Sequence, residues 1–505
     1  MATSQKIISA LHANWWLNLA GLLLSFGASV VLVRTMPSGL YAEYGVVIAM
    51  IGLATLVFEA GANSGLTRYL KEAGEQHARG TFYRRMQRRR WLAALACGVA
   101  LAVFGPMYAR STQFASLAAQ PWLFALIAAI VAASLTRLLA HYGLLALFES
   151  KTALLLQQGF LVLRSVALAL IALAGGSLLA LVGAMLALGL IEALVVHRRL
   201  WRLIGAERAP VATSFINRAQ TLGLLTVFDK ACAMLGSGSV LLLVLAPNHP
   251  ATTIAFLTLA VDLVGKLVSL TVMPMGNLVA PYLSQTGDDP AAQGVAVARV
   301  VKLSSLLYSL SIGAGLLVLP PFIIAVYGAR YSGAITLALV LLVPTAFENW
   351  IRGCCSPALL RNGRYRALAK VNIAQAVITL ATLALVWRQS VEIVIFAVGI
   401  ARSAVASLNL VALRPLVPSG SYRVPLLAAL TALFGCVAAG AFELLFPLPA
   451  PSGLAVQGLI FASVFCIGLK WVLVRDADIA AIIRRLAGTR VKAVGWLLPA
   501  MPILD

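Results

Sequence analysis

The sequence predicts an all-α polytopic membrane protein with about 14 transmembrane helices. The chain has 505 residues, of which 61% are hydrophobic and only 11% are charged, and its mean hydropathy is +0.94. Soluble domains are about 45–50% apolar and about 25% charged, so a soluble chain of this composition could not bury its apolar surface. The apolar residues also form runs of about 18–25, the length that crosses ~30 Å of hydrocarbon as a helix.

Fourteen apolar segments are long enough to span a bilayer. The first six lie at about 14–33, 41–63, 91–108, 122–145, 154–174 and 178–196. The next six lie at about 220–246, 252–283, 301–327, 334–351, 370–387 and 391–413, and the last two at 425–446 and 455–474. Segment 252–283 is longer than a bilayer requires, which predicts a tilt or a continuation beyond the membrane.

The distribution of Lys and Arg among the loops tests the predicted number of spans. Alternate loops with their adjoining span ends, starting at the N-terminus, carry 30 of the 39 Lys and Arg residues, whereas the other loops carry four. Lys and Arg concentrate in cytoplasmic loops, so both termini are predicted to be cytoplasmic and the number of spans to be even. Fourteen spans fit better than thirteen, and twelve with one wrongly divided pair stays an alternative.

The net charge of +22 is explained by this loop pattern rather than by nucleic-acid binding, so no nucleic-acid partner is expected. The basic linker from Lys71 to Arg90 is predicted to contact anionic membrane lipids, with substrate recruitment as an alternative role. The segment 476–505 is interrupted by charges and predicted to be an amphipathic helix on the cytoplasmic interface. The first apolar run has no small-residue cleavage site and is interpreted as a retained span.

The sequence predicts no metal site, nucleotide-binding site or cofactor. The six cysteines lie mostly in apolar runs, and neither disulfides nor a metal site follows from their spacing. No nucleotide-binding signature is present, which excludes an ATP-driven pump. We therefore expect no catalytic residue and no cofactor, and the protein is not expected to be an enzyme.

A weak internal repeat indicates two lobes. Residues 28–31 (ASVV) resemble residues 238–241 (GSVL), and the Tyr-Leu step at 69–70 recurs at 282–283. The offsets of 210 and 213 predict an N-terminal six-helix lobe at 1–200 and a C-terminal six-helix lobe at 201–415, around a central cavity. Two additional helices follow at 416–475.

Several stretches resemble the polysaccharide flippases of the multidrug/oligosaccharidyl-lipid/polysaccharide exporter superfamily. The first span ends in VLVRTM and is followed by PSGLYAEYGVVIAMIGLATLVFEAG, which is similar to the family's entry into the second span. The segments FDKACAML and MPMGNLVAPYLSQ resemble the family's Asp-basic pair and its proline-terminated eighth helix. The resemblance covers about residues 10–415 and rests on the order and spacing of these motifs.

Charged residues inside the spans carry the functional prediction. An ionised side chain at the bilayer centre costs roughly 2.5–3.5 kcal/mol, so each one needs a reason. Near mid-membrane the cations are Arg137, Arg164, Lys230, Lys266 and Arg402, and the anions are Asp229 and Asp262. Five cations against two anions favour an anionic ligand such as a lipid pyrophosphate or an acidic sugar.

Each of these residues also has a structural interpretation. Asp262 and Lys266 are four apart and can neutralise one another on one helix face. The three arginines can pair with backbone carbonyls or with a distant acid instead of lining a cavity. Glu59, Glu192, Glu348 and Glu443 are placed nearer to span ends, where interfacial solvation is expected. Glu348 is nevertheless a candidate, with Asp229 and Asp262, for ion coupling or pairing.

The resemblance implies a flippase of the bacterial cytoplasmic (inner) membrane. It would move a polyprenyl-pyrophosphate-linked oligosaccharide, an exopolysaccharide or O-antigen repeat unit, from the inner to the outer leaflet by alternating access. A polysaccharide polymerase and export machinery are the implied partners. The alternatives are a cation-coupled multidrug exporter of the same superfamily and a membrane-embedded polysaccharide polymerase or ligase.

Overall fold

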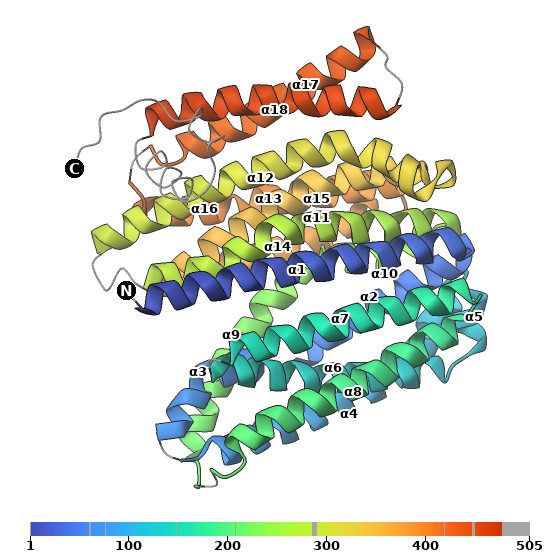
Figure 1. Ribbon diagram of the computed structural model, residues 1–505. Coiled ribbons are helices and arrows are strands. Elements are labelled where there is room, and N and C mark those ends of the chain that lie inside the picture. The colour runs from blue at the N-terminus through green and yellow to red at the C-terminus, as the bar shows by residue number, and fades with distance from the viewer. Residues whose placement is uncertain are drawn as a thin grey trace. The chain divides into compact units, whose positions relative to one another are not determined.

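The computed structural model describes residues 2–59, 62–75, 77–147, 149–207, 209–284, 290–418, 420–446 and 450–476 (Figure 1). Every element in these ranges is helical, which confirms the predicted all-α class. The interfacial helix predicted at 476–505 falls, beyond Asp476, outside the described residues. The chain divides into two compact units, Met1–Leu259 and Ala260–Asp505, and each is considered separately below.

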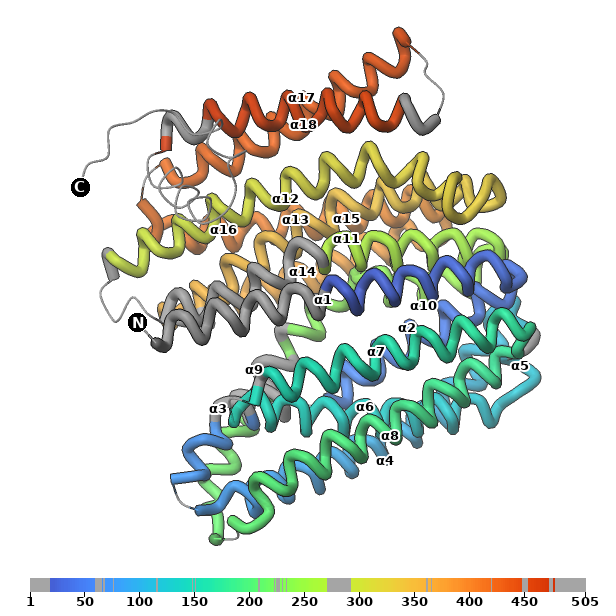
Figure 2. The backbone as a smooth tube through the Cα atoms, viewed as in Figure 1, coloured from blue at the N-terminus to red at the C-terminus, as the bar shows by residue number. Residues whose placement is uncertain are grey.

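The first unit contains ten helices and the start of an eleventh among its described residues. They are α1 (Ala2–Thr35), α2 (Ser38–Phe58), α3 (Ala62–Glu75), α4 (Arg79–Ser111), α5 (Ala115–Ala119), α6 (Leu123–Ala146), α7 (Ser150–Leu173), α8 (Leu178–Ile204), α9 (Thr213–Met234), α10 (Gly238–Leu245) and the start of α11 (Ala251–Ser284). Helix α6 packs against both α4 and α8, and α1 packs along α7 (Figures 1 and 2).

The second unit begins within α11. It continues with α12 (Pro290–Tyr327), η1 (Ala329–Tyr331), α13 (Gly333–Arg361), α14 (Tyr365–Val386), α15 (Val391–Ala406), α16 (Leu408–Leu413), η2 (Arg414–Leu416), α17 (Arg423–Leu445) and α18 (Ala450–Arg475). Helix α13 packs on α12 and α15, and α14 packs on α15. Helices α17 and α18 lie side by side and pack against α12 (Figure 2).

The number of membrane-spanning segments in the structure agrees with the predicted count of about 14. Twelve described helices have the length and apolar composition needed to cross a membrane, and α1 contributes a shorter apolar stretch, Leu19–Thr35. The remaining predicted span, 220–246, is divided in the structure between α9 and α10. Large apolar side chains such as Leu92, Leu95 and Val99 on α4 are exposed, as the lipid-facing side of a membrane helix requires.

Local sequence explains where several helices begin and end. The Ser177 hydroxyl accepts a hydrogen bond from the Ala180 amide and caps α8, and Ser237 caps α10 in the same way. Gly175 precedes α8 at φ 70° and Gly328 follows α12 at φ 88°. Both lie in the left-handed region, which glycine adopts without steric cost, so both allow the chain to reverse between helices.

The basic linker between the second and third predicted spans is more ordered than its composition indicates. Helix α4 begins at Arg79, twelve residues before the predicted start of the span at 91. The Gly80 amide donates to the Glu207 carbonyl over 3.0 Å, and a Cβ at Gly80 would lie 2.5 Å from that oxygen. The Arg79 guanidinium also binds the Glu207 carboxylate at 2.9 Å, so the linker is fixed against the segment after α8.

Candidate functional site

The charged residues predicted near mid-membrane form ion-pair clusters within each unit. In the first unit the centre is Glu192 on α8, a residue only 1% exposed. Its Oε2 atom accepts from Arg137 Nη1 at 2.7 Å and from Arg164 Nη2 at 2.8 Å. Its Oε1 atom lies 3.2 Å from His141 Nε2. We call these four residues the Glu192 cluster.

Helix geometry explains how the Glu192 cluster assembles. Arg137 and His141 are four apart on α6, so they lie on one face of that helix. Helix α8 packs against both α6 and α7, which brings Glu192 between them and Arg164 on α7. Two arginines share one carboxylate, so the cluster has a net positive charge even with His141 neutral.

The second unit contains a corresponding arrangement centred on Glu348 of α13. Arg402 on α15 binds both carboxylate oxygens, with Nε donating to Oε2 at 2.9 Å and Nη2 donating to Oε1. Arg352 Nε donates to Glu348 Oε1 at 3.0 Å. Gln375 on α14 donates to the same oxygen at 2.9 Å and accepts from Arg352 Nη2 at 2.6 Å. These four residues form the Glu348 cluster.

The two clusters occupy equivalent positions in the internal repeat. Arg137 and Glu348 are numbered 211 apart, as are His141 and Arg352, and Arg164 and Gln375, while Glu192 and Arg402 are 210 apart. The offset matches that of the sequence repeat at 28–31 and 238–241. The signs are exchanged: α6 carries the arginine and α8 the carboxylate in the first unit, whereas α13 carries the carboxylate and α15 the arginine in the second. Each cluster nevertheless has two arginines for one glutamate.

Lys230 and Lys266 are also paired with acids. Lys230 Nζ on α9 lies 3.2 Å from Glu59 Oε1 at the end of α2, and Glu59 is 6% exposed. Lys266 Nζ lies 2.6 Å from Asp262 Oδ2, four residues earlier on α11. Asp262 and Lys266 therefore make the contact that their structural interpretation requires. Asp229 lies on α9, but its side chain is outside the described residues.

Apart from Lys266, the predicted cations are paired with glutamates that the sequence interpretation had placed near span ends. The expected solvation near span ends was wrong for Glu59, Glu192 and Glu348, which are 6%, 1% and 9% exposed and are ion-paired. Glu192 lies near the middle of α8, because that helix continues to Ile204. His141, Arg352 and Gln375 were not identified as site residues. The repeat offset of 211 is the sequence feature that pairs His141 with Arg352 and Arg164 with Gln375. Among the described residues no group of three His, Cys, Asp or Glu side chains could hold a metal ion.

Comparison with known proteins gives a consistent family and fold. The profile of a family described as polysaccharide biosynthesis protein matches residues 13–287. No curated protein sequence matches the chain. Among solved structures, the lipid II flippase MurJ, in an inward closed conformation, superposes with a TM-score of 0.73 at 13% identity, covering 91% of this chain and 98% of MurJ.

Multidrug transporters share the same architecture less closely. The MATE multidrug transporter DinF-BH, solved as a complex, has a TM-score of 0.57 at 14% identity and covers 81% of this chain and 95% of its own. A MOP-superfamily transporter from Pyrococcus furiosus also has a TM-score of 0.57, at 13% identity, covering 81% and 94%. The chain therefore has the fold of MOP-superfamily membrane transporters.

Proposed function

We propose that this chain, which belongs to the polysaccharide biosynthesis protein family, is a flippase for a polyprenyl-pyrophosphate-linked oligosaccharide. It moves this lipid from the inner to the outer leaflet of the bacterial cytoplasmic membrane by alternating access, with both termini cytoplasmic. The observation that carries the proposal is the pair of clusters, each around a buried carboxylate, in which two arginines share that one carboxylate. Each cluster leaves guanidinium charge that its own carboxylate does not balance.

Arginine pairs suit a pyrophosphate group. A guanidinium offers a planar fork of donors that matches phosphate oxygens, and these charge-assisted bonds are roughly twice as strong as neutral ones. In the Glu192 cluster, Arg164 uses Nη2 for the carboxylate, while its buried Nε atom has no hydrogen-bond partner among the described residues. A buried donor without a partner costs ~1–3 kcal/mol, which a phosphate oxygen would recover.

The clusters also hold arginines ready for a ligand within the membrane. Unpaired, each buried guanidinium would carry a large desolvation cost, and Glu192 and Glu348 offset part of it. A doubly charged pyrophosphate would contact the same two arginines that the carboxylate already orients, and it would meet a cluster whose net charge is positive before binding. Lys230, with Glu59 as its partner, is the further candidate for substrate contact, whereas Lys266 is satisfied by Asp262 within its own helix.

The relatives support this substrate class over a cationic one. MurJ is by name a lipid II flippase, and the family profile refers to polysaccharide biosynthesis. A cation-coupled multidrug exporter, the alternative suggested by the MATE-type structures, needs a neutral or acidic interior to receive cationic drugs. The excess of arginine over glutamate in both clusters favours the anionic substrate.

Reconstituted vesicles test the proposal. The full-length protein is placed in proteoliposomes with a polyprenyl-pyrophosphate-linked oligosaccharide, and its appearance on the opposite leaflet is followed with a membrane-impermeant glycan-modifying enzyme. We expect protein-dependent translocation and no uptake of a cationic dye in parallel vesicles. Uptake of the dye without translocation of the lipid would instead identify a multidrug exporter.

A further inference from the structure

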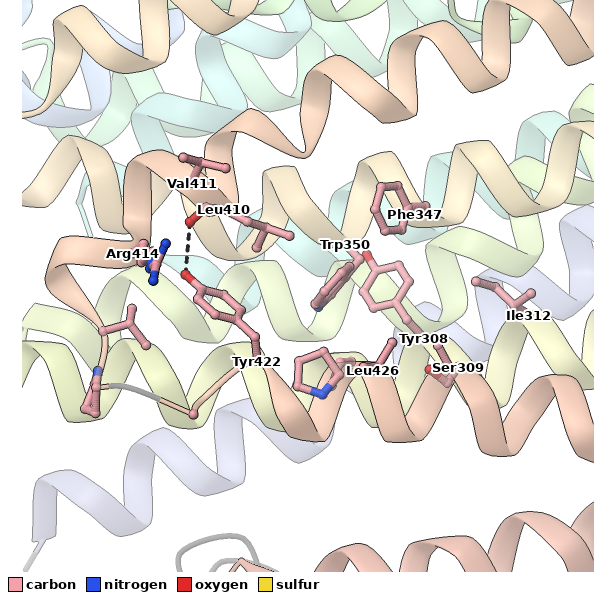
Figure 3. Close-up of a pocket in the computed structure, with 16 residues that line it drawn as sticks. Tyr308, Ser309, Ile312, Phe347, Trp350, Leu410, Val411, Arg414, Tyr422 and Leu426 are labelled. Atoms are coloured by element: carbon pink, nitrogen blue, oxygen red, sulfur yellow. Dashed lines mark hydrogen bonds between the residues drawn. The ribbon is translucent and has the colours of Figure 1, made fainter.

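A groove in the second unit lies apart from both charged clusters. A pocket of about 740 Å³ is lined by residues of α12, α13, α16, η2 and α17 (Figure 3). A second pocket of about 770 Å³ is lined by α12, α13, α15 and α17. The two share four lining residues, Ser309, Ile312, Phe347 and Ala429, so they form one continuous groove along α17.

One end of this groove is polar and cationic. Arg414 is the one charged side chain among the described residues that line the two pockets, and it lies beside Tyr422 (Figure 3). The Tyr422 hydroxyl donates to the Leu410 carbonyl at 3.0 Å. Burial raises the pKa of Tyr422 to about 12, so the hydroxyl stays protonated and keeps this bond at neutral pH. Arg414 forms no ion pair with any described residue, and its charge is available to a ligand.

Tyr308 supplies a second polar feature deeper in the groove. Its side chain is 3% exposed and lies next to Trp350 in the pocket (Figure 3). The Tyr308 hydroxyl has no hydrogen-bond partner among the described residues. The Trp350 indole, by contrast, donates to Ser304 Oγ at 3.0 Å and is satisfied. A buried hydroxyl without a partner is unfavourable, which indicates a ligand atom that accepts its hydrogen bond.

Beyond Tyr308 the groove is apolar. The second pocket is lined mainly by aliphatic and aromatic side chains such as Leu316, Val343 and Phe396. Moving along the groove, a ligand therefore meets a cation, then the Tyr308 hydroxyl, then a mainly hydrocarbon wall that also contains the Ser403 hydroxyl. This order matches a phosphate, an ester carbonyl and an acyl chain, whose buried CH₂ groups add to the binding free energy.

We infer that this groove binds one anionic membrane phospholipid, with its phosphate at Arg414, an ester oxygen at Tyr308 and an acyl chain in the second pocket. The charge pattern of the loops predicts the Arg414 end to be cytoplasmic, and basic pockets between transmembrane helices on that side bind anionic headgroups. A single arginine matches the single charge of a phosphodiester, whereas a pyrophosphate is better matched by the paired arginines of the clusters. The site does not depend on the proposed transport function.

Native mass spectrometry of the delipidated full-length protein tests the site. The protein is titrated in detergent with phosphatidylglycerol and, separately, with phosphatidylethanolamine. We expect one phosphatidylglycerol to bind more tightly than phosphatidylethanolamine. Arg414→Gln should weaken phosphatidylglycerol binding about tenfold, because it removes a charge-assisted contact. Arg388→Gln, which changes the net charge equally at the far end of α14, should leave the affinity unchanged.

Two further variants keep the test independent of folding defects. Tyr308→Phe preserves the ring and should weaken both lipids severalfold, and Ala429→Trp should block the wall that the two pockets share. Phosphatidylglycerol affinity that is the same in the wild type, Arg414→Gln and Ala429→Trp would overturn the inference. Displacement of bound phosphatidylglycerol by an equal concentration of polyprenyl phosphate would overturn it as well, because the groove would then select the carrier lipid.

Discussion

Arg402 on α15 binds both carboxylate oxygens of Glu348 on α13, and both residues are buried. In the first unit the equivalent positions carry Glu192 and Arg137, so the same contact is made with the charges exchanged. Helices whose cluster residues are 210–211 positions apart thus carry an arginine–carboxylate link in each unit, with the charges exchanged between the helices. The central consequence is that each cluster contains two arginines for one carboxylate.

Substitution of Glu192 is expected to reduce stability more than substitution of any other carboxylate in the first unit. Glu192→Gln leaves Arg137 and Arg164 buried without their shared counter-charge, and breaking a buried pair costs about 3–5 kcal/mol. Thermal unfolding of the detergent-solubilised protein should show a clear loss of stability. Glu443→Gln, an exposed carboxylate on α17, is the matched control. Equal unfolding temperatures for the two variants would contradict the assigned role of Glu192.

The Glu348–Arg402 contact should behave as a coupled pair. A double-mutant cycle with Glu348→Gln and Arg402→Gln should give an interaction free energy of about 0.5–3 kcal/mol, because the second substitution removes a partner already lost. The free energies of unfolding are obtained by denaturant titration in mixed micelles. Strict additivity of the two substitutions would show that the contact does not form.

The Asp262–Lys266 pair is expected to contribute little to stability or to translocation. The two side chains are 34% and 16% exposed, and a pair four residues apart on a helix contributes about 0.3–0.5 kcal/mol. The double variant with Asp262→Asn and Lys266→Gln should therefore keep near-wild-type stability and translocation. A loss of translocation in this double variant at unchanged stability would instead place the pair in the transport site.

Gly80 should tolerate no side chain. A Cβ at this position would lie 2.5 Å from the Glu207 carbonyl oxygen, so Gly80→Ala forces the start of α4 away from the segment after α8 and should cost about 1–3 kcal/mol. Gly159→Ala on α7, where no atom lies within 4 Å of the added Cβ, is the control. It should be neutral or slightly stabilising, since alanine favours the helix. Differential scanning fluorimetry compares the two.

Hydropathy was sufficient to predict the helical class and the approximate positions of the spans. In a bilayer the backbone polar groups must be satisfied within each segment, so length and apolarity alone identify a spanning helix. The break at Leu235–Ser237, which divides α9 from α10, was not predicted. It occurs inside an apolar run, where the capping role of Ser237 is hidden by the hydrophobicity around it.

The pairing of charges could be predicted only within a helix. Asp262 and Lys266 are four residues apart, and their contact follows from helical spacing alone. Arg137 and Glu192 are 55 residues apart and meet because α6 packs on α8, which no local pattern encodes. Glu192 was misplaced because the basic residues from His197 to Arg199 resemble the end of a span, although α8 continues beyond them to Ile204.

The initial rate of lipid-linked oligosaccharide translocation in proteoliposomes tests the role of the paired arginines most directly. Arg164 and Arg402 are replaced singly by Lys and by Gln, with Arg330→Gln on η1 as a control, and the amount of folded protein is matched by size-exclusion chromatography. Both Gln variants should lose at least about tenfold in translocation rate, because they lose the charge and the planar donor fork that bind phosphate. The Lys variants keep the charge and should lose less, and the control should keep the wild-type rate. Wild-type rates in folded Arg164→Gln and Arg402→Gln proteins would contradict a cationic substrate site.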